Sequence, residues 1–131
     1  MLFTRTLADR AIVSVQNVLR LLPRSVPQPD LALLVPRDDF YTTTHPQAPD
    51  VFLVVEVADT SLRYDRDRKM PLYARYRIPE AWVVDVNRAE VLMHRAPSED
   101  GYAETFTVSR GGELRIEAFG DVVYPAEDVL G

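Results

Sequence analysis

The chain has 131 residues, no cysteine and a formal net charge of −5. The lack of cysteine excludes a disulfide framework and a thiolate metal site, and the acidic balance argues against a protein that binds nucleic acid through a broad basic surface. A chain of this length suits one domain with one modest core, and no apolar run is long enough to span a membrane. We therefore expect a single cytoplasmic domain over residues 1–131, with no membrane contact.

The first third of the chain predicts a short helix and two strands. Residues 2–10 carry apolar side chains at helical spacing, and residues 11–17 alternate as a strand does, with residues 18–22 as a second apolar segment that could pair with them. Three prolines within residues 23–29 predict an extended loop, because proline cannot donate to a strand ladder. Residues 30–35 form the next predicted strand, and residues 36–49 a polar loop bounded by prolines.

The middle of the chain predicts one central strand and the main helix. Residues 51–58 (VFLVVEVA) are apolar apart from Glu56, as expected for a strand covered on both faces. Residues 59–61 offer helix N-cap chemistry, and most of residues 62–76 should be helical. Pro71 is tolerated in a first helical turn but not in an interior, so a helix that starts near Arg68 is the alternative.

The last third predicts two hairpins. Residues 80–86 and 89–96 flank a tight turn at Asn87-Arg88, and residues 102–109 and 113–119 are separated by Gly111-Gly112. Residues 125–130 suit a short terminal turn or helix. The predicted fold class is therefore mixed α/β (α+β), a sheet with little helix and an extra C-terminal hairpin.

Glu56 and Asp30 are candidate functional carboxylates. A carboxylate inside an apolar strand is costly unless it is paired, hydrogen-bonded or metal-bound. Alternation places Glu56 on one strand face with Val54 and Ala58. An ion pair with an arginine, or a strand end that reaches solvent, would explain Glu56 equally well. Asp30 follows Pro29, where an aspartate often serves only as a turn or strand-end residue.

Lys69 is the one lysine among 15 cationic residues. Lysine offers a compact charge and a tunable proton that arginine lacks, although chance also explains a single lysine. Asp65, Lys69 and Tyr73 recur every four residues, and Lys69 shares a helical stripe with Leu72 and Tyr76. If this stripe faces the sheet, Lys69 and Asp65 point towards Glu56. The simpler alternative is a surface ion pair between Asp65 and Lys69.

Two carboxylates on adjacent strands and a lysine are the minimal set for metal-assisted hydrolysis of a phosphodiester. The carboxylates of Asp30 and Glu56 would hold Mg²⁺, a hard ion that keeps several waters. The metal would polarise the phosphate and acidify a water, and Lys69 would orient that water or offset the developing charge.

These residues resemble the Uma-type restriction-endonuclease-like family of the PD-(D/E)XK nuclease superfamily, over most of the chain and most specifically from Asp30 to Asp85. The resemblance implies a restriction-endonuclease-like mixed sheet with flanking helices, and a DNA endonuclease site that uses Mg²⁺ or Mn²⁺. It matches Asp30 and Glu56 to the acidic motif residues and adds the backbone carbonyl of Val57 as a metal ligand. Ala58 stands where the superfamily has lysine, and the resemblance transfers that role to Lys69.

The same resemblance leaves several points open. Asp65 and Tyr73 match recurrent family positions and are accessory candidates. Residues 1–10 look shorter than the N-terminal segment of relatives, which would favour a homodimer or abolish activity. The alternative function is therefore a catalytically inactive nuclease-fold module that binds a protein partner or dimerises, in which Glu56 pairs with a cation and binds no metal. We expect His45 to be solvated and His94 to be structural.

Overall fold

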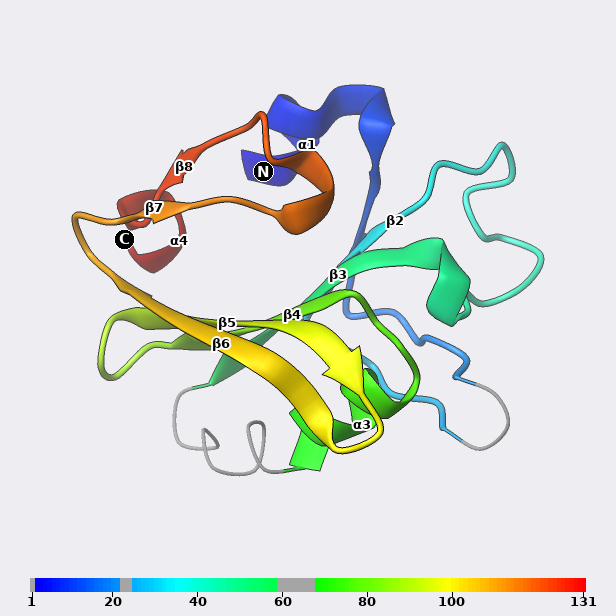
Figure 1. Cartoon of the computed structure of the whole chain (residues 1–131). Helices are drawn as coiled ribbons and strands as arrows, with labels where there is room; N and C mark the ends of the chain where they lie inside the picture. The colour runs from blue at the N-terminus through cyan, green and yellow to red at the C-terminus, as the bar shows by residue number, and fades with distance from the viewer. Residues whose placement is uncertain (1, 22–24, 59–67) are drawn as a thin grey trace.

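The centre of the protein is a mixed sheet of six strands in the order β1-β2-β3-β4-β5-β6 (Figure 1). The structure is a computed structural model that describes residues 2–21, 25–58 and 68–131. The strands are β1 (Ile12–Val15), β2 (Leu31–Leu34), β3 (Val51–Ala58), β4 (Glu80–Asp85), β5 (Glu90–Ser98) and β6 (Gly101–Ser109). Only β3 and β4 run parallel, and the other neighbours are antiparallel.

Short helices and a small second sheet surround this sheet. They are α1 (Leu2–Leu7), α3 (Met70–Arg75), α4 (Glu127–Leu130), the 3-10 turns η1 (Ala8–Arg10), η2 (Ala48–Asp50) and η4 (Glu117–Phe119), and the strands β7 (Glu113–Leu114) and β8 (Tyr124–Pro125). No helix in the described ranges is long and apolar enough to cross a membrane. The architecture is mixed α+β with few helices, which confirms the predicted fold class.

Both faces of the sheet are covered (Figure 1). On one face, Leu53, Val55 and Trp82 pack against Phe3 of α1 and against residues of the C-terminal segment such as Ile116. On the other face, Val54 and Val83 pack against Tyr73 of α3 and Ile78. Strands β3 and β4 contribute to both cores, so their nearly continuous apolar sequences follow from burial on two sides.

Two predicted pairings are wrong. Strand β1 pairs with β2, not with residues 18–22, and Leu19 and Leu21 of that segment are buried in the core on the α3 side. Strand β6 pairs with β5 instead of with residues 113–119. Those residues contain the buried Leu114, Ile116 and Phe119, and a hairpin with the exposed edge strand β6 would have left these side chains in water.

The described part of the helix predicted over residues 62–76 is α3 (Met70–Arg75). Arg68 and Lys69 form a π-type turn, α3 begins at Met70, and Pro71 lies in its first turn. Proline is tolerated at this position because its missing N–H costs little in a first helical turn. Residues 62–67 lie outside the described residues.

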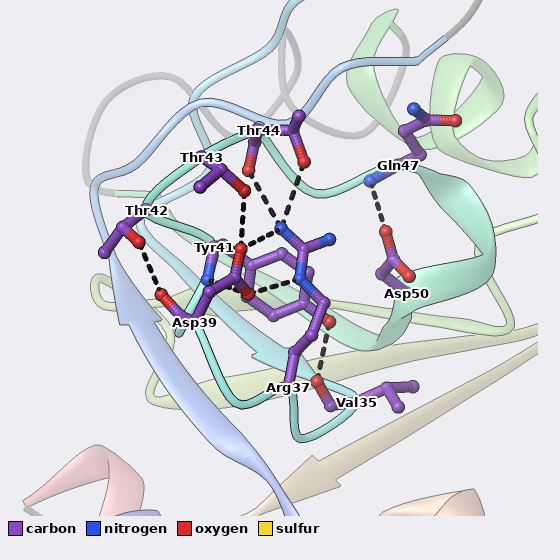
Figure 2. A network of polar contacts seen from close by, with 9 residues as sticks. All are labelled: Val35, Arg37, Asp39, Tyr41, Thr42, Thr43, Thr44, Gln47 and Asp50. Carbon is purple, nitrogen blue, oxygen red and sulfur yellow. Dashed lines mark hydrogen bonds and ion pairs between the residues drawn. The ribbon is translucent and has the colours of Figure 1, made fainter.

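The loop between β2 and η2 is held by a polar network around Arg37 (Figure 2). The Arg37 guanidinium donates to both carboxylate oxygens of Asp39 and to the Thr44 hydroxyl, and it lies 4.0 Å from the ring centroid of Tyr41. The hydrogen bond from Arg37 holds the pKa of the Asp39 carboxyl well below its usual range. The loop leaves the end of β2 opposite to Asp30, so its charges order the loop and lie away from the predicted site.

Candidate metal-binding and catalytic site

The candidate site lies where β3 extends beyond its pairing with β2. The β2–β3 ladder ends at the pair Leu31↔Val55, so residues 56–58 have no β2 partner. On its other side, β3 continues to pair with β4 as far as Ala58↔Asp85. The carboxyl end of β3 is therefore open on one side, and such strand ends are where open α/β sheets bind ligands.

Asp30 occupies this open side. Its Oδ2 accepts a hydrogen bond of 2.7 Å from the backbone N–H of Val57, which replaces the missing ladder bond. The Asp30 carbonyl accepts from the backbone N–H of Gln16 at 3.1 Å, and the Gln16 carbonyl accepts from Gln28 Nε2 at 2.5 Å. Gln16 has a positive φ of 51°, a strained conformation for a residue with a side chain. The side chain of Asp30 therefore binds β3, while its carbonyl binds the residue that follows β1.

A hollow of about 300 Å³ opens beside Asp30 on the sheet face that carries α1 and α4. Val57 and Val86, both about half exposed, line it together with Phe3 and Leu130. Asp30 lies at the rim of this hollow and is partly exposed, whereas the Glu56 side chain points to the α3 side of β3.

Glu56 is buried against α3, with 2% of its surface exposed. Its Oε2 accepts a hydrogen bond from the Tyr73 hydroxyl at 2.7 Å, and its Oε1 lies 3.4 Å from Lys69 Nζ. Lys69 and Tyr73 are four residues apart, so the helical turn between them places both on the face that meets the sheet. The buried carboxylate is thus held by one neutral donor and one cation.

Burial is the main cause of a raised pKa for the Glu56 carboxyl. The hydrogen bond from Tyr73 and the charge of Lys69 oppose this rise, whereas the negative charge of Asp30 adds to it. The two carboxylates are therefore close enough to repel each other. A cation bound near both would favour their ionised forms.

The structure brings four of the predicted residues together at the end of β3: Asp30, Glu56, Lys69 and Tyr73. Asp65 lies outside the described residues. The sheet-facing stripe of α3 differs from the prediction, because Met70, Tyr73 and Ala74 are buried while Leu72 and Tyr76 are only partly so. The catalytic and metal-binding roles of these residues stay predictions.

Two buried carboxylates, Glu80 and Asp85, were not among the residues predicted from the sequence for the site. Glu80 is fully buried and accepts from Trp82 Nε1, Arg95 Nε and the backbone N–H of Glu117, all within 2.9 Å. This set of donors makes Glu80 a structural carboxylate. Asp85 is the last residue of β4, and its burial beside Ala58 depends on strand pairing that the sequence alone does not show.

The two histidines behave as expected. His45 is exposed on its loop. His94 is buried on β5, where its Nδ1 lies 3.2 Å from the Thr105 hydroxyl and its ring packs near Tyr102. Within the described ranges, no three Asp, Glu, His or Cys side chains are close enough together to hold one metal ion.

Comparison with known protein families adds the decisive observation. The model of the Uma2 family, described as "Putative restriction endonuclease", matches residues 2–127. The chain belongs to the Uma2 family. This confirms the predicted resemblance and supports nuclease activity, a hydrolase function, for this Uma2 member.

A solved structure supports the same fold. It is the crystal structure of a "putative nuclease belonging to DUF820" from Anabaena variabilis ATCC 29413, which is 11% identical to this Uma2 member. The two superpose with a TM-score of 0.73 over 98% of this chain and 73% of that chain. At this identity the likeness shows the fold alone. No functionally curated protein matches the sequence.

Proposed function

We propose that this protein is a Mg²⁺-dependent endonuclease that hydrolyses DNA phosphodiester bonds, in which Mn²⁺ can replace Mg²⁺. The observation that carries the proposal is that, at the open end of β3, Asp30 binds the backbone N–H of Val57 while Lys69 contacts the adjacent Glu56, in a chain whose family is described as "Putative restriction endonuclease". We assign metal binding to Asp30 and Glu56 and the orientation of water to Lys69. In this proposal, residues 1–131 act as one restriction-endonuclease-like domain in the cytoplasm.

The available donors suit a hard divalent cation. Only Oδ2 of Asp30 takes up the Val57 N–H, which leaves Oδ1 as a donor atom for a metal. The N–H and C=O of one strand residue point to the same side, so the Val57 carbonyl should face the same gap beyond β2. With two carboxylates and one carbonyl as protein ligands, several positions remain for water and phosphate, as Mg²⁺ prefers.

The bound metal would supply Lewis-acid activation of the phosphate. Lys69 has one-third of its side-chain surface exposed (32%), whereas that of Glu56 is 2% exposed, so the lysine reaches the carboxylate from the solvent side. The separation of 3.4 Å between Lys69 Nζ and Glu56 Oε1 exceeds the usual length of about 2.7–2.9 Å for a charge-assisted hydrogen bond. Lys69 is therefore placed to hold the attacking water and to offset negative charge on the phosphate. Tyr73 acts as a positioning residue, because it fixes the Glu56 carboxylate.

A second candidate function is a catalytically inactive module that binds a protein partner or forms a homodimer. The ion pair between Lys69 and Glu56 favours this alternative, because a carboxylate that already has a cation needs no metal to be buried. The acidic net charge of −5 also gives no broad surface for DNA.

Two measurements on the full chain separate these functions. We expect calorimetric titration to show binding of Mg²⁺ and Mn²⁺, and plasmid nicking to require one of these ions. Nicking should be lost in Glu56→Ala and in Lys69→Ala, and it should survive in Arg68→Ala, a matched change at the exposed neighbouring position. Nicking that persists in both site variants would remove the site assignment. A wild type that neither binds metal nor nicks DNA would favour the module, whose dimerisation sedimentation velocity can then test.

A further inference from the structure

The carboxylate of Asp85 has one buried oxygen that the proposed site does not yet explain. Asp85 is the last residue of β4, and only 2% of its surface is exposed. Its Oδ1 accepts from the backbone N–H of Arg88 at 3.1 Å, which closes the turn towards β5. Its Oδ2 has no hydrogen-bond partner in the part of the chain that the structure describes. Buried polar atoms are nearly always paired, so an unpaired carboxylate oxygen needs a specific reason.

Strand register places Asp85 on the same side of the sheet as Glu56. Asp85 pairs with Ala58, and Glu56 pairs with Val83 in the same parallel ladder. Alternate strand residues share a face, so Val83 and Asp85 both point to the α3 side, where Val83 and Ala58 belong to one core cluster. From a strand spacing of about 4.8 Å and a rise of about 3.3 Å per residue, the α-carbons of Glu56 and Asp85 lie about 8 Å apart. Ala58, the direct neighbour of Asp85, offers no side-chain donor.

This separation decides between two ways in which Asp85 could serve a metal. Among the residues that the structure covers, no three acidic or imidazole side chains are close enough to share one ion, which argues against Asp85 as a third direct ligand. A hydrated divalent ion needs acceptors beyond its direct ligands, because Mg²⁺ keeps several waters and each carries protons. Carboxylates in this outer position orient the site and commonly change metal affinity about 10- to 100-fold.

We propose that Asp85 is a positioning residue of the metal site, and that its Oδ2 accepts a hydrogen bond from the hydration shell of a divalent ion held by Asp30 and Glu56. The inference rests on the proposed function and adds the strand β4 to it. The site then takes one carboxylate from each of three neighbouring chain segments, Asp30 before β2, Glu56 in β3 and Asp85 at the end of β4.

The variant Asp85→Asn tests this role. The amide keeps the shape of the side chain and an acceptor for the Arg88 N–H, but it places an NH₂ group where Oδ2 stood. We expect the Kd for Mn²⁺, measured by calorimetry with MnCl₂ on the full chain, to rise about ten-fold or more. The melting temperature of the metal-free protein should not fall, because the turn contact is kept. Asp100→Asn, in the exposed turn between β5 and β6, is the matched control and should change neither value.

A second variant distinguishes the contribution of Asp85 to the turn from its contribution to metal binding. Asp85→Ala also loses the contact with the Arg88 N–H, so its melting temperature should fall below that of Asp85→Asn, while its Mn²⁺ affinity should match that of Asp85→Asn. An Asp85→Asn protein that binds Mn²⁺ as tightly as the wild type would overturn the inference and leave the nuclease proposal standing. A weaker affinity that is explained wholly by unfolded protein would also overturn it. If the wild type binds no Mn²⁺ and nicks no DNA, both proposals fail together.

Discussion

The Tyr73 hydroxyl donates a 2.7 Å hydrogen bond to Glu56 Oε2, and this contact joins α3 to the central strand β3 inside the core. Tyr73 has no exposed surface and Glu56 almost none. A hydrogen bond to a charged group contributes about 1.5–3 kcal/mol to stability. Tyr73 therefore fixes the position of Glu56 as well as packing the helix against the sheet.

Replacing Tyr73 by Phe should reduce stability and raise the pKa of Glu56 further. The ring packing is kept, but the ionised carboxylate loses a donor that lowers its pKa. We expect the free energy of unfolding at pH 7 to fall by about 1.5–3 kcal/mol in urea denaturation. Tyr76→Phe, at a half-buried position just after the same helix, should change it by less than about 0.5 kcal/mol. Equal losses in the two variants would show that the hydroxyl of Tyr73 has no special role.

The raised pKa of Glu56 makes the stability of the metal-free protein depend on pH. Burial raises the folded-state pKa above the unfolded value, so the folded state holds the proton more tightly. The contribution of this tighter proton binding to stability is fully present below the ordinary carboxyl pKa of about 4.3, and it is lost as the pH rises through the pKa of Glu56 in the folded state. Relative to Glu56→Gln, the wild type should therefore become less stable between pH 4 and neutral pH, as urea denaturation at several pH values can show. If the free energy of unfolding of the wild type rises relative to that of Glu56→Gln as the pH rises, this prediction is wrong.

Asp30→Asn should strongly weaken metal binding without unfolding the protein. The amide oxygen can still accept the Val57 N–H, so the melting temperature should stay close to that of the wild type. The lost charge should weaken Mn²⁺ binding in calorimetry by more than the roughly 10- to 100-fold effect of outer-shell partners. Asp38→Asn, at an exposed loop position, is the control and should leave the affinity unchanged. Undiminished Mn²⁺ affinity in Asp30→Asn would remove Asp30 from the site.

In contrast to Asp30→Asn, Glu80→Gln should lower the stability and leave metal binding unchanged, because Glu80 is a structural carboxylate. Its oxygens accept from two side chains and one backbone N–H, and the Arg95 guanidinium would lose its charged partner. We expect the free energy of unfolding to fall by about 3 kcal/mol, with the Mn²⁺ affinity of the folded protein unchanged. Glu113→Gln, which changes an exposed glutamate on β7, serves as the control. A loss of Mn²⁺ affinity in folded Glu80→Gln would connect this cluster to the metal site.

Lys69→Arg separates the charge of the lysine from its shape. Arginine keeps the positive charge near Glu56, but its planar guanidinium cannot replace a compact ammonium that orients a water. Plasmid nicking should fall by about 10²-fold, within the range for a positioned acid–base group, while Mn²⁺ affinity stays within about two-fold. Full nicking activity in Lys69→Arg would reduce the role of Lys69 to charge alone.

The local features of the sequence were enough to predict several of the structural elements. The apolar run of β3, the turn between β4 and β5 and the polar loop after β2 follow from strand patterning and turn residues, which neighbouring positions encode. The pairing of residues 113–119 with β6 was predicted wrongly, because their apolar pattern alone does not show whether they pair with β6 or cover the sheet, whereas the short terminal turn or helix predicted over residues 125–130 is present as α4. The place of residues 113–119 depends on the buried face around Trp82, which lies about 30 residues earlier in the chain.

The candidate site was likewise predictable only in part from the sequence. The sequence by itself determined that a carboxylate lies in a core strand, because it interrupts an apolar run, and that a single lysine follows it, because every other cationic residue is arginine. Only the tertiary structure decided that the helix face with Lys69 and Tyr73 meets Glu56, that Asp30 bonds the open end of β3, and that Asp85 is buried beside Ala58. Local patterning sets which face a side chain takes, whereas strand order and helix docking set its neighbours, and these arise from packing between distant segments.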